Sequence, residues 1–545
     1  MAISLIGQLI LLVIFLWAKH EYCLTDSTGC LEDIFFKLWW LSLFVTLSNI
    51  GIFALLVIGV YMLVRDIAKE ERRDTLNFIR PSPRSTQTIL LGKMMGVPIL
   101  LYIVAVLALP LHLWAGIAAT IPLGKILAFD AVLVASCIFF YSAAQLFTLA
   151  TTAFLKCQAW LASGFMLMFL CILFLKHYKC NYLPLERELR NRVVLDNCLD
   201  WLLNLFDPWV TIPYIIQSAS ERLEDIELYF HLCYSDLASW QWFGLPLGTS
   251  AIAAVSLVLV NYALWNYWIW HGLSRCFPNP SAKIIGKRQS YVLVASFQVA
   301  ILGFARVNNS SSSNFMDSCT SFLLLNFFLF LGLIAILSPN RQNFHDWARY
   351  RLPSSRADPR ADPGKHFRNP SWQDWIWGEK SPAPVAIAIN LLITAAFFIP
   401  WIVLYDADND YKMKAIAYFI LYITLILTYA LIAQLILLIK LSKRKIWAAR
   451  AVAVAIILPP ILLFILSARK NFIFTTMFSM LQDIPKAAPF LWTFSILPLL
   501  DIQNANTSTS FIPFLSHLFA IGGLSLCLKR HLERAGTSAI RVASS

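Results

Sequence analysis

Long apolar runs, separated by polar or Pro- and Gly-containing links, dominate the pattern along this 545-residue chain. Many runs reach about 20 residues, the length that an α-helix needs to cross the hydrocarbon core of a bilayer. In the first part of the chain, the runs predict helices at 2–18, 36–64, 88–114, 125–154, 158–176 and 244–272. In the second part, they predict helices at 290–307, 318–338, 383–404, 413–440, 447–467 and 511–528. The pattern therefore predicts an all-α, polytopic membrane protein with about 12 transmembrane helices in two six-helix halves.

The two sets of runs are separated by a polar link that contains Pro278, Pro280, Lys283, Lys287 and Arg288. We therefore expect two transmembrane domains, residues 1–285 and 286–545. The loops at 177–243 and 468–510 occupy matching places in the two halves, and both contain aromatic, Pro-interrupted apolar stretches. Interrupted segments at corresponding positions are typical of transporters built from repeats, although coincidence among apolar runs is the alternative explanation.

Composition excludes a soluble enzyme, because 59% of the residues are hydrophobic and only 14% are charged, against about 25% charged in soluble domains. The net charge of +13 comes from 44 basic and 31 acidic residues, and no nucleic-acid motif accompanies it. Basic residues gather in loops on one side of the predicted spans, which the positive-inside rule assigns to the cytoplasm. We therefore expect 65–87, 339–382 and both termini to be cytoplasmic, and 177–243 to lie outside.

The segment between the second and third predicted helices, residues 65–87, gives the main indication of function. After a charged start, residues 76–79 supply an apolar patch, and Pro81 and Pro83 then stop the helix. Ser85 or Thr86 can cap the next helix. The expected structure is a short amphipathic element on the membrane surface, joined to two spans. A solvated basic loop that merely follows the positive-inside rule is the alternative.

The order of residues here resembles the segment after the second helix of type-2 ABC exporter permeases, with a Glu-Arg start, Gly-Thr-Leu, Ser-Pro and Ile-Leu-x-Gly-Lys. The matching residues are Glu71, Arg72, Thr75, Leu76, Ser82, Pro83, Ile89, Leu90, Gly92 and Lys93. Asp74 stands where the family usually has Gly, a difference that affects the backbone turn expected at this position and not the resemblance as a whole. The resemblance implies a permease that forms the translocation path of an ATP-driven exporter in a plasma membrane, the inner membrane in bacteria.

The resemblance also implies that residues 69–80 form a coupling helix, which rests on a separate nucleotide-binding ATPase subunit. The residues that would contact this partner are Glu70, Glu71, Arg72, Thr75, Leu76, Ser82 and Pro83. Because surface substitutions usually cost less than about 0.5 kcal/mol, we expect replacement of Glu71 or Leu76 to lower transport without disturbing folding. In the second half, residues 372–382 keep only Glu379 and a Ser381-Pro382 pair, which leaves a second coupling element open.

The chain carries no P-loop, since none of its four Gly-Lys pairs is followed by Ser or Thr. We therefore expect no ATPase activity and no cofactor in this chain, with ATP and magnesium on the partner subunit. No Cys-x-x-Cys pair or His-Glu-x-x-His helix signals a metal site either. Catalytic and metal-ligating residues are accordingly not predicted.

Polar residues in the spans are further candidates: His112, Asp130 and His271 near span ends, and Asn261, Asn390 and Gln434 deeper inside. Snorkelling or helix-end hydrogen bonds account for the first group. The deeper amides either join helices by hydrogen bonds or line a substrate path. Which of these two uses applies is left open by the sequence.

Two other function classes remain as alternatives. The first predicted outer loop contains Glu32 and Asp33, and lipid-linked glycosyltransferases with many spans carry a similar acidic pair as a base. Cys23 and Cys30 in the same loop would form a disulfide if that compartment is oxidising. An ion-coupled secondary transporter is the second alternative, but such proteins place carboxylates near the bilayer midplane, and the spans here hold almost none.

Overall fold

The computed structural model describes residues 7–10, 12–14, 32–151, 157–178, 205–220, 241–280, 282–305, 312–339, 341–351, 372–439, 446–456 and 511–543. These residues form helices joined by turns and contain no β-strand. Nine helices within them are long and apolar enough to cross a membrane. This confirms the predicted all-α, multi-pass membrane character, whereas the predicted number of 12 spans is not confirmed.

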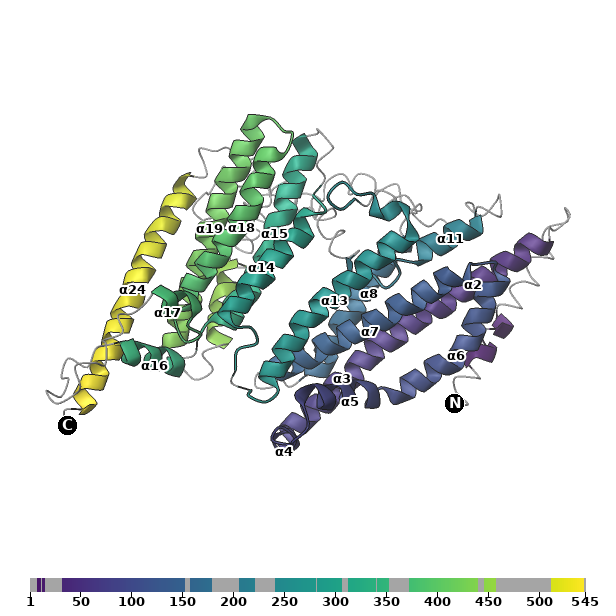
Figure 1. Ribbon diagram of the computed structural model, residues 1–545, viewed down its shortest axis with the longest axis horizontal. Helices are drawn as coiled ribbons and strands as arrows, with labels where there is room; N and C mark the ends of the chain where they lie inside the picture. Colours follow the sequence, from purple (N-terminus) through teal and green to yellow (C-terminus); the bar gives the residue numbers. More distant parts are fainter. Residues whose placement is uncertain are drawn as a thin grey trace, which may run out of the picture. The chain divides into compact units, whose positions relative to one another are not determined.

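The described residues divide into two compact units, the first ending at Ile284 and the second beginning at Ile285. Unit 1 contains α2 (Glu32–Phe53), η1 (Ala54–Ile58), α3 (Gly59–Arg72), α4 (Thr75–Ile79), α5 (Thr86–Gly96), α6 (Ile99–Ala118), α7 (Leu123–Thr151), α8 (Gln158–Tyr178), α11 (Ile212–Ser220), η3 (Leu247–Thr249) and α13 (Ala251–Cys276). Successive long helices of this unit run in opposite directions (Figure 1). As a result, α4 and α5 lie at the end of the unit where α13 finishes, and α11 lies at the opposite end.

The first long span of unit 1 runs without a break from α2 through η1 to α3. Its middle turn, η1, is a π-helix, in which wider hydrogen-bonded rings leave some backbone carbonyls open to other donors. The Tyr141 hydroxyl of α7 donates to the Leu55 carbonyl at 2.7 Å. Gly59 lies so close to the Tyr141 hydroxyl that any larger residue there would collide with it. The span that leads directly into α4 is thus locked to α7 at this turn.

The prediction of one helix at 88–114 is wrong. The chain instead forms two helices, α5 and α6, with a break at Val97 and Pro98. Val97 keeps helical backbone angles, whereas Pro98 departs from them and lacks the N–H group that would continue the helical hydrogen bonds, which explains the break. The apolar run was continuous in sequence, but its first third is a separate short helix beside α4.

Unit 2 contains α14 (Lys287–Leu302), α15 (Ser312–Leu337), α16 (Arg341–Arg351), α17 (Trp372–Trp377), α18 (Ala383–Leu404), α19 (Asn409–Leu438) and α24 (Phe511–Ala543). A further apolar helix covers Ile446–Ile456. The rest of the predicted helix at 447–467 lies outside the described residues, as do most of 2–18, most of the loop 177–243 and all of the loop 468–510. Lys287 and Arg288, expected in a polar link, begin helix α14.

Candidate functional site

Asp74 makes the turn between α3 and α4. Its backbone is left-handed, with φ of +58°, a conformation that glycine adopts without steric cost and that Asp tolerates better than most residues. The Asp74 carboxylate also accepts a hydrogen bond from the Asn77 side-chain amide at 3.2 Å. Aspartate therefore keeps the turn at the position where type-2 permeases usually have glycine.

Leu76 holds α4 against the rest of unit 1. A five-residue helix is too short to be stable alone, but Leu76 is only 1% exposed and packs in a cluster with Leu90, Leu273 and Phe277. Leu90 lies in α5, Leu273 lies in α13, and Phe277 is the residue that follows α13. The expectation that Leu76 is a surface residue is therefore wrong, and the small cost expected for its replacement no longer follows.

Arg80 ties the end of α4 to two distant parts of the chain. Its guanidinium lies 2.8 Å from the Glu71 carboxylate and donates to the Phe277 carbonyl at 2.9 Å. It also donates to the Asn77 side chain. Because the Arg80 side chain is largely buried, these charge-assisted hydrogen bonds are shielded from water and hold α4 to α3 and α13.

Lys93 joins α5 to α3 in the same way. Its ammonium lies 3.0 Å from Asp66 and 2.6 Å from Glu70. The buried Gln145 amide of α7 also donates to the Leu90 carbonyl of α5 at 3.1 Å. Ser85 caps α5 by accepting from the Thr88 amide at 3.2 Å, as its position after the prolines predicts. The segment from α3 to α5 is thus one braced unit.

Phe78 points away from this braced unit. It is 83% exposed, although it lies only two residues after the buried Leu76, because residues i and i+2 of a helix face different sides. Arg72, Arg73 and Asn77 are also exposed. An exposed aromatic side chain surrounded by polar groups is typical of a protein–protein contact.

The seven predicted coupling residues divide into two groups. Glu70, Glu71 and Leu76 bind within unit 1, and the Thr75 hydroxyl donates to the Glu70 carbonyl at 3.1 Å. Arg72 and Pro83 are exposed, and Ser82 is half-buried. Sequence reasoning missed the bracing role of Arg80 and the outward direction of Phe78. The i, i+2 relation of Leu76 and Phe78 in a short helix indicates that they face different sides, but not which of them faces outward.

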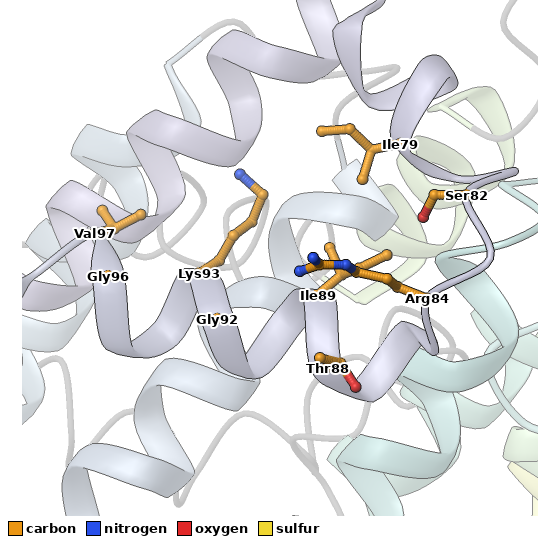
Figure 2. Close-up of a pocket in the computed structure, with 9 residues that line it drawn as sticks. All are labelled: Ile79, Ser82, Arg84, Thr88, Ile89, Gly92, Lys93, Gly96 and Val97. Atoms are coloured by element: carbon orange, nitrogen blue, oxygen red, sulfur yellow. The ribbon is translucent and has the colours of Figure 1, made fainter.

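A pocket of about 450 Å³ lies beside α4 (Figure 2). It is lined by Ile79, Ser82, Arg84, Thr88, Ile89, Gly92, Lys93, Gly96 and Val97. Figure 2 shows that one face of α5 forms its floor, with the turn carrying Ser82 and Arg84 at one end. The matched residues Ser82, Ile89, Gly92 and Lys93 therefore surround a common space.

Unit 2 carries a short helix, α17, in the corresponding predicted loop, and α14 anchors it. The ammonium of the buried Lys287 donates to the Ser381 hydroxyl and, at 3.3 Å, to the Pro382 carbonyl. The Tyr291 hydroxyl donates to the Ile376 carbonyl at 2.8 Å. The Arg288 guanidinium lies 5.0 Å from the Trp377 ring centroid. Glu379 is exposed at the edge of this segment.

The deeper candidate amides all join structural elements. Asn261 donates to the Leu205 carbonyl at 2.9 Å, and Asn390 donates to the Ser290 hydroxyl at 3.1 Å. Gln434 accepts from the Ala383 backbone amide at 3.5 Å. These contacts favour interhelical hydrogen bonding over the lining of a substrate path.

The candidates near span ends behave differently from one another. His112 is buried and lies 2.9 Å from the Ser48 hydroxyl, stacked on Phe44, so it joins two helices instead of snorkelling. His271 contacts the ring of Tyr267 and is half-buried, as is Asp130. These three residues belong to three different helices, and no described contact brings them together.

Other predicted features lie partly outside the described residues. Cys23 and Cys30 lie outside the described residues, and so do the other cysteines of the predicted outer loops, Cys180, Cys198 and Cys233. Glu32 and Asp33 form the first turn of α2 and not a loop, a position where acidic residues favour a helix start. Within the described ranges, no group of three or more His, Cys, Asp or Glu side chains is placed to hold a metal ion.

A comparison of the chain with protein-family models, with curated proteins and with solved structures finds no match.

Proposed function

We propose that this chain is the permease of an ATP-driven ABC exporter and that α4 is the element that docks on a separate nucleotide-binding ATPase subunit. The ATP and magnesium would be bound by that partner, since this chain has no P-loop. The spans would form the translocation path in a plasma membrane, the bacterial inner membrane if the source is bacterial.

One observation supports the proposal above the others: a short helix is fixed rigidly to the spans while presenting an aromatic side chain outward. A solvated loop needs neither the buried Leu76 nor the three ion pairs that Arg80 and Lys93 form with Glu71, Asp66 and Glu70. A docking element needs these contacts, because a force applied at Phe78 reaches the spans only if α4 stays fixed to them.

The contacts also indicate where such a force would go. A displacement of α4 reaches α13 through the Arg80 bond to the Phe277 carbonyl. The displacement reaches α5 through the contact of Leu76 with Leu90. It reaches α3 through the ion pairs of Lys93 with Asp66 and Glu70. Since α3 continues through η1 into α2, one long span moves with α4. Closure of the ATPase partner would thereby tilt several helices of unit 1 together.

In unit 2, α17 is the element in the matching loop. Trp377 is 42% exposed and is held by Arg288 and Tyr291. We propose that it makes a second, smaller contact with the ATPase partner, because the surrounding residues keep little of the pattern found in unit 1.

The decisive experiment is purification of the full chain from its native membrane, with assay of ATP hydrolysis in the co-purified material. We expect the chain alone to be inactive and the complex to hydrolyse ATP. Phe78→Asp should reduce recovery of the ATPase subunit at unchanged chain yield. An aspartate at Phe165 cannot serve as the control, because Phe165 lies in a candidate span, where a charge would disturb membrane insertion.

The matched control pair is therefore Phe78→Ala and Phe165→Ala, two exposed phenylalanines of unit 1 at 83% and 66% exposure. We expect weaker association with Phe78→Ala alone. Full association and transport with Phe78→Ala and Phe78→Asp would reject α4 as the docking element. Nucleotide hydrolysis by the isolated chain would reject the division of labour between permease and ATPase.

A further inference from the structure

The pocket beside α4 has a polar end and an apolar end. Ser82 and Arg84 lie at the end nearest α4, whereas Gly96 and Val97 lie at the foot of the span α6 (Figure 2). Its volume of about 450 Å³ falls within the usual range for small-molecule sites. The pocket therefore has the size and polarity gradient of a site for an amphiphile.

Charge at the polar end is not balanced within the protein. The Lys93 ammonium contacts Asp66 and Glu70 and is neutralised by them. Arg84, in contrast, takes part in no ion pair with any residue that the structure describes. Its guanidinium extends over Ile89 toward the Lys93 side of the pocket (Figure 2). The site therefore offers one uncompensated cation, which indicates an anionic ligand.

A second polar group at this end lacks a partner. The Ser82 side-chain oxygen is inaccessible to water and forms no hydrogen bond within the described residues. A buried hydroxyl without a partner costs free energy, which a bound acceptor would recover once the side chain rotates toward the ligand. An arginine and a hydroxyl two residues apart in the same bend match a phosphate oxygen set, since arginine binds phosphate in a two-bond geometry.

The apolar end lies where α5 ends and α6 begins. Gly92 and Gly96 have open space where a side chain would begin. Beyond Val97, the residues Ile99, Leu100 and Ile103 of α6 are exposed. Exposed apolar side chains on a spanning helix contact acyl chains, so the pocket leads from a cationic end directly to the hydrocarbon.

We propose that this pocket binds an anionic phospholipid, with its phosphate at Arg84 and Ser82 and its acyl chains along Gly96, Val97 and α6. The predicted cytoplasmic position agrees with this ligand, because that leaflet carries the anionic lipids. Lipid binding at this site requires only this chain, so it can be tested without the ATPase partner.

The test is native mass spectrometry of the purified full chain titrated with phosphatidylglycerol, or with phosphatidylcholine of the same acyl chains. We expect a preference for phosphatidylglycerol that Arg84→Gln lowers about tenfold, the usual scale for loss of a charged hydrogen bond. Gly92→Leu, which fills the pocket without changing charge, should lower binding similarly. Arg73→Gln is the matched control, because Arg73 is an exposed arginine near α4 that does not line the pocket.

Three results would overturn the proposal. Equal losses with Arg73→Gln and Arg84→Gln would indicate general attraction to a basic surface. Equal binding of the two lipids would remove the anionic preference. Complete displacement of phosphatidylglycerol by millimolar inorganic phosphate would assign the site to a soluble phosphate and not to a lipid. Because Arg84→Gln changes an exposed side chain, it keeps the test valid even if Gly92→Leu fails to fold.

Discussion

Replacement of Leu76 by alanine should unlock α4 while leaving the spans folded. Leu→Ala changes at fully buried sites cost about 2–5 kcal/mol, and Leu76 is 1% exposed within a cluster of four buried side chains. A five-residue helix has almost no stability of its own. The whole loss should therefore fall on the local equilibrium between docked and open α4.

Hydrogen exchange of the full chain, followed by mass spectrometry, measures that equilibrium. The amide of Arg80 donates to the Leu76 carbonyl at 3.0 Å, and the amide of Ser82 donates to the Ile79 carbonyl at 3.1 Å. Both become open to exchange when α4 detaches. A loss of 2 kcal/mol corresponds to exchange about 30-fold faster in this segment.

Phe78→Ala is the control on the opposite face of the same helix. Because the Phe78 side chain contacts little of unit 1, its removal should change local stability by less than about 0.5 kcal/mol, or about twofold in exchange. Equal acceleration in both variants would refute the assignment of a buried and an exposed face to α4. Unchanged exchange in Leu76→Ala would refute the claim that this residue holds the helix in place.

Asp74→Gly should change stability by less than about 1 kcal/mol, because the relief of left-handed strain is offset by the lost Asn77 hydrogen bond and by the backbone entropy of glycine; a large shift in the midpoint of thermal unfolding, in either direction, would contradict this. Lys287→Ala should lower stability by about 1–3 kcal/mol, since it removes donors from the Ser381–Pro382 turn, whereas Lys380→Ala at an exposed site should have little effect in the same thermal assay. In single-cysteine variants, Cys157 should react with an impermeant maleimide only from the cytoplasm. Leu245→Cys should react only from outside, and labelling of both from one side would contradict their placement at opposite ends of unit 1.

Most of the long helices that the structure describes could be predicted from sequence, because the bilayer constrains the backbone of each span locally. Every backbone polar group in hydrocarbon must be satisfied within its own segment, so an apolar run of spanning length becomes a helix. The run at 383–404 has the same bounds in the structure as in the prediction. The error at 88–114 arose because Pro98 interrupts a helix without interrupting the apolar pattern.

The candidate site was predictable only as a location. The order of residues from Glu71 to Lys93 indicated a short amphipathic element between two spans, and α4 lies there. The sequence could not say that Leu76 faces inward and Phe78 outward, since both are apolar and the difference depends on what packs beside them. Arg80 likewise bonds to a carbonyl 197 residues away, which no local pattern encodes.

Burial of charge was decided by tertiary structure alone. Lys287 was expected in a polar link but lies buried under the turn that follows α17, where the Ser381 hydroxyl and the Pro382 carbonyl satisfy it. Arg84, from another basic loop, remains without an ion pair among the described residues, beside an open pocket. Sequence determined that these cations lie at the ends of spans, because charge is excluded from hydrocarbon. Which of them is neutralised within the chain depends on long-range partners, and only the folded arrangement of helices supplies those.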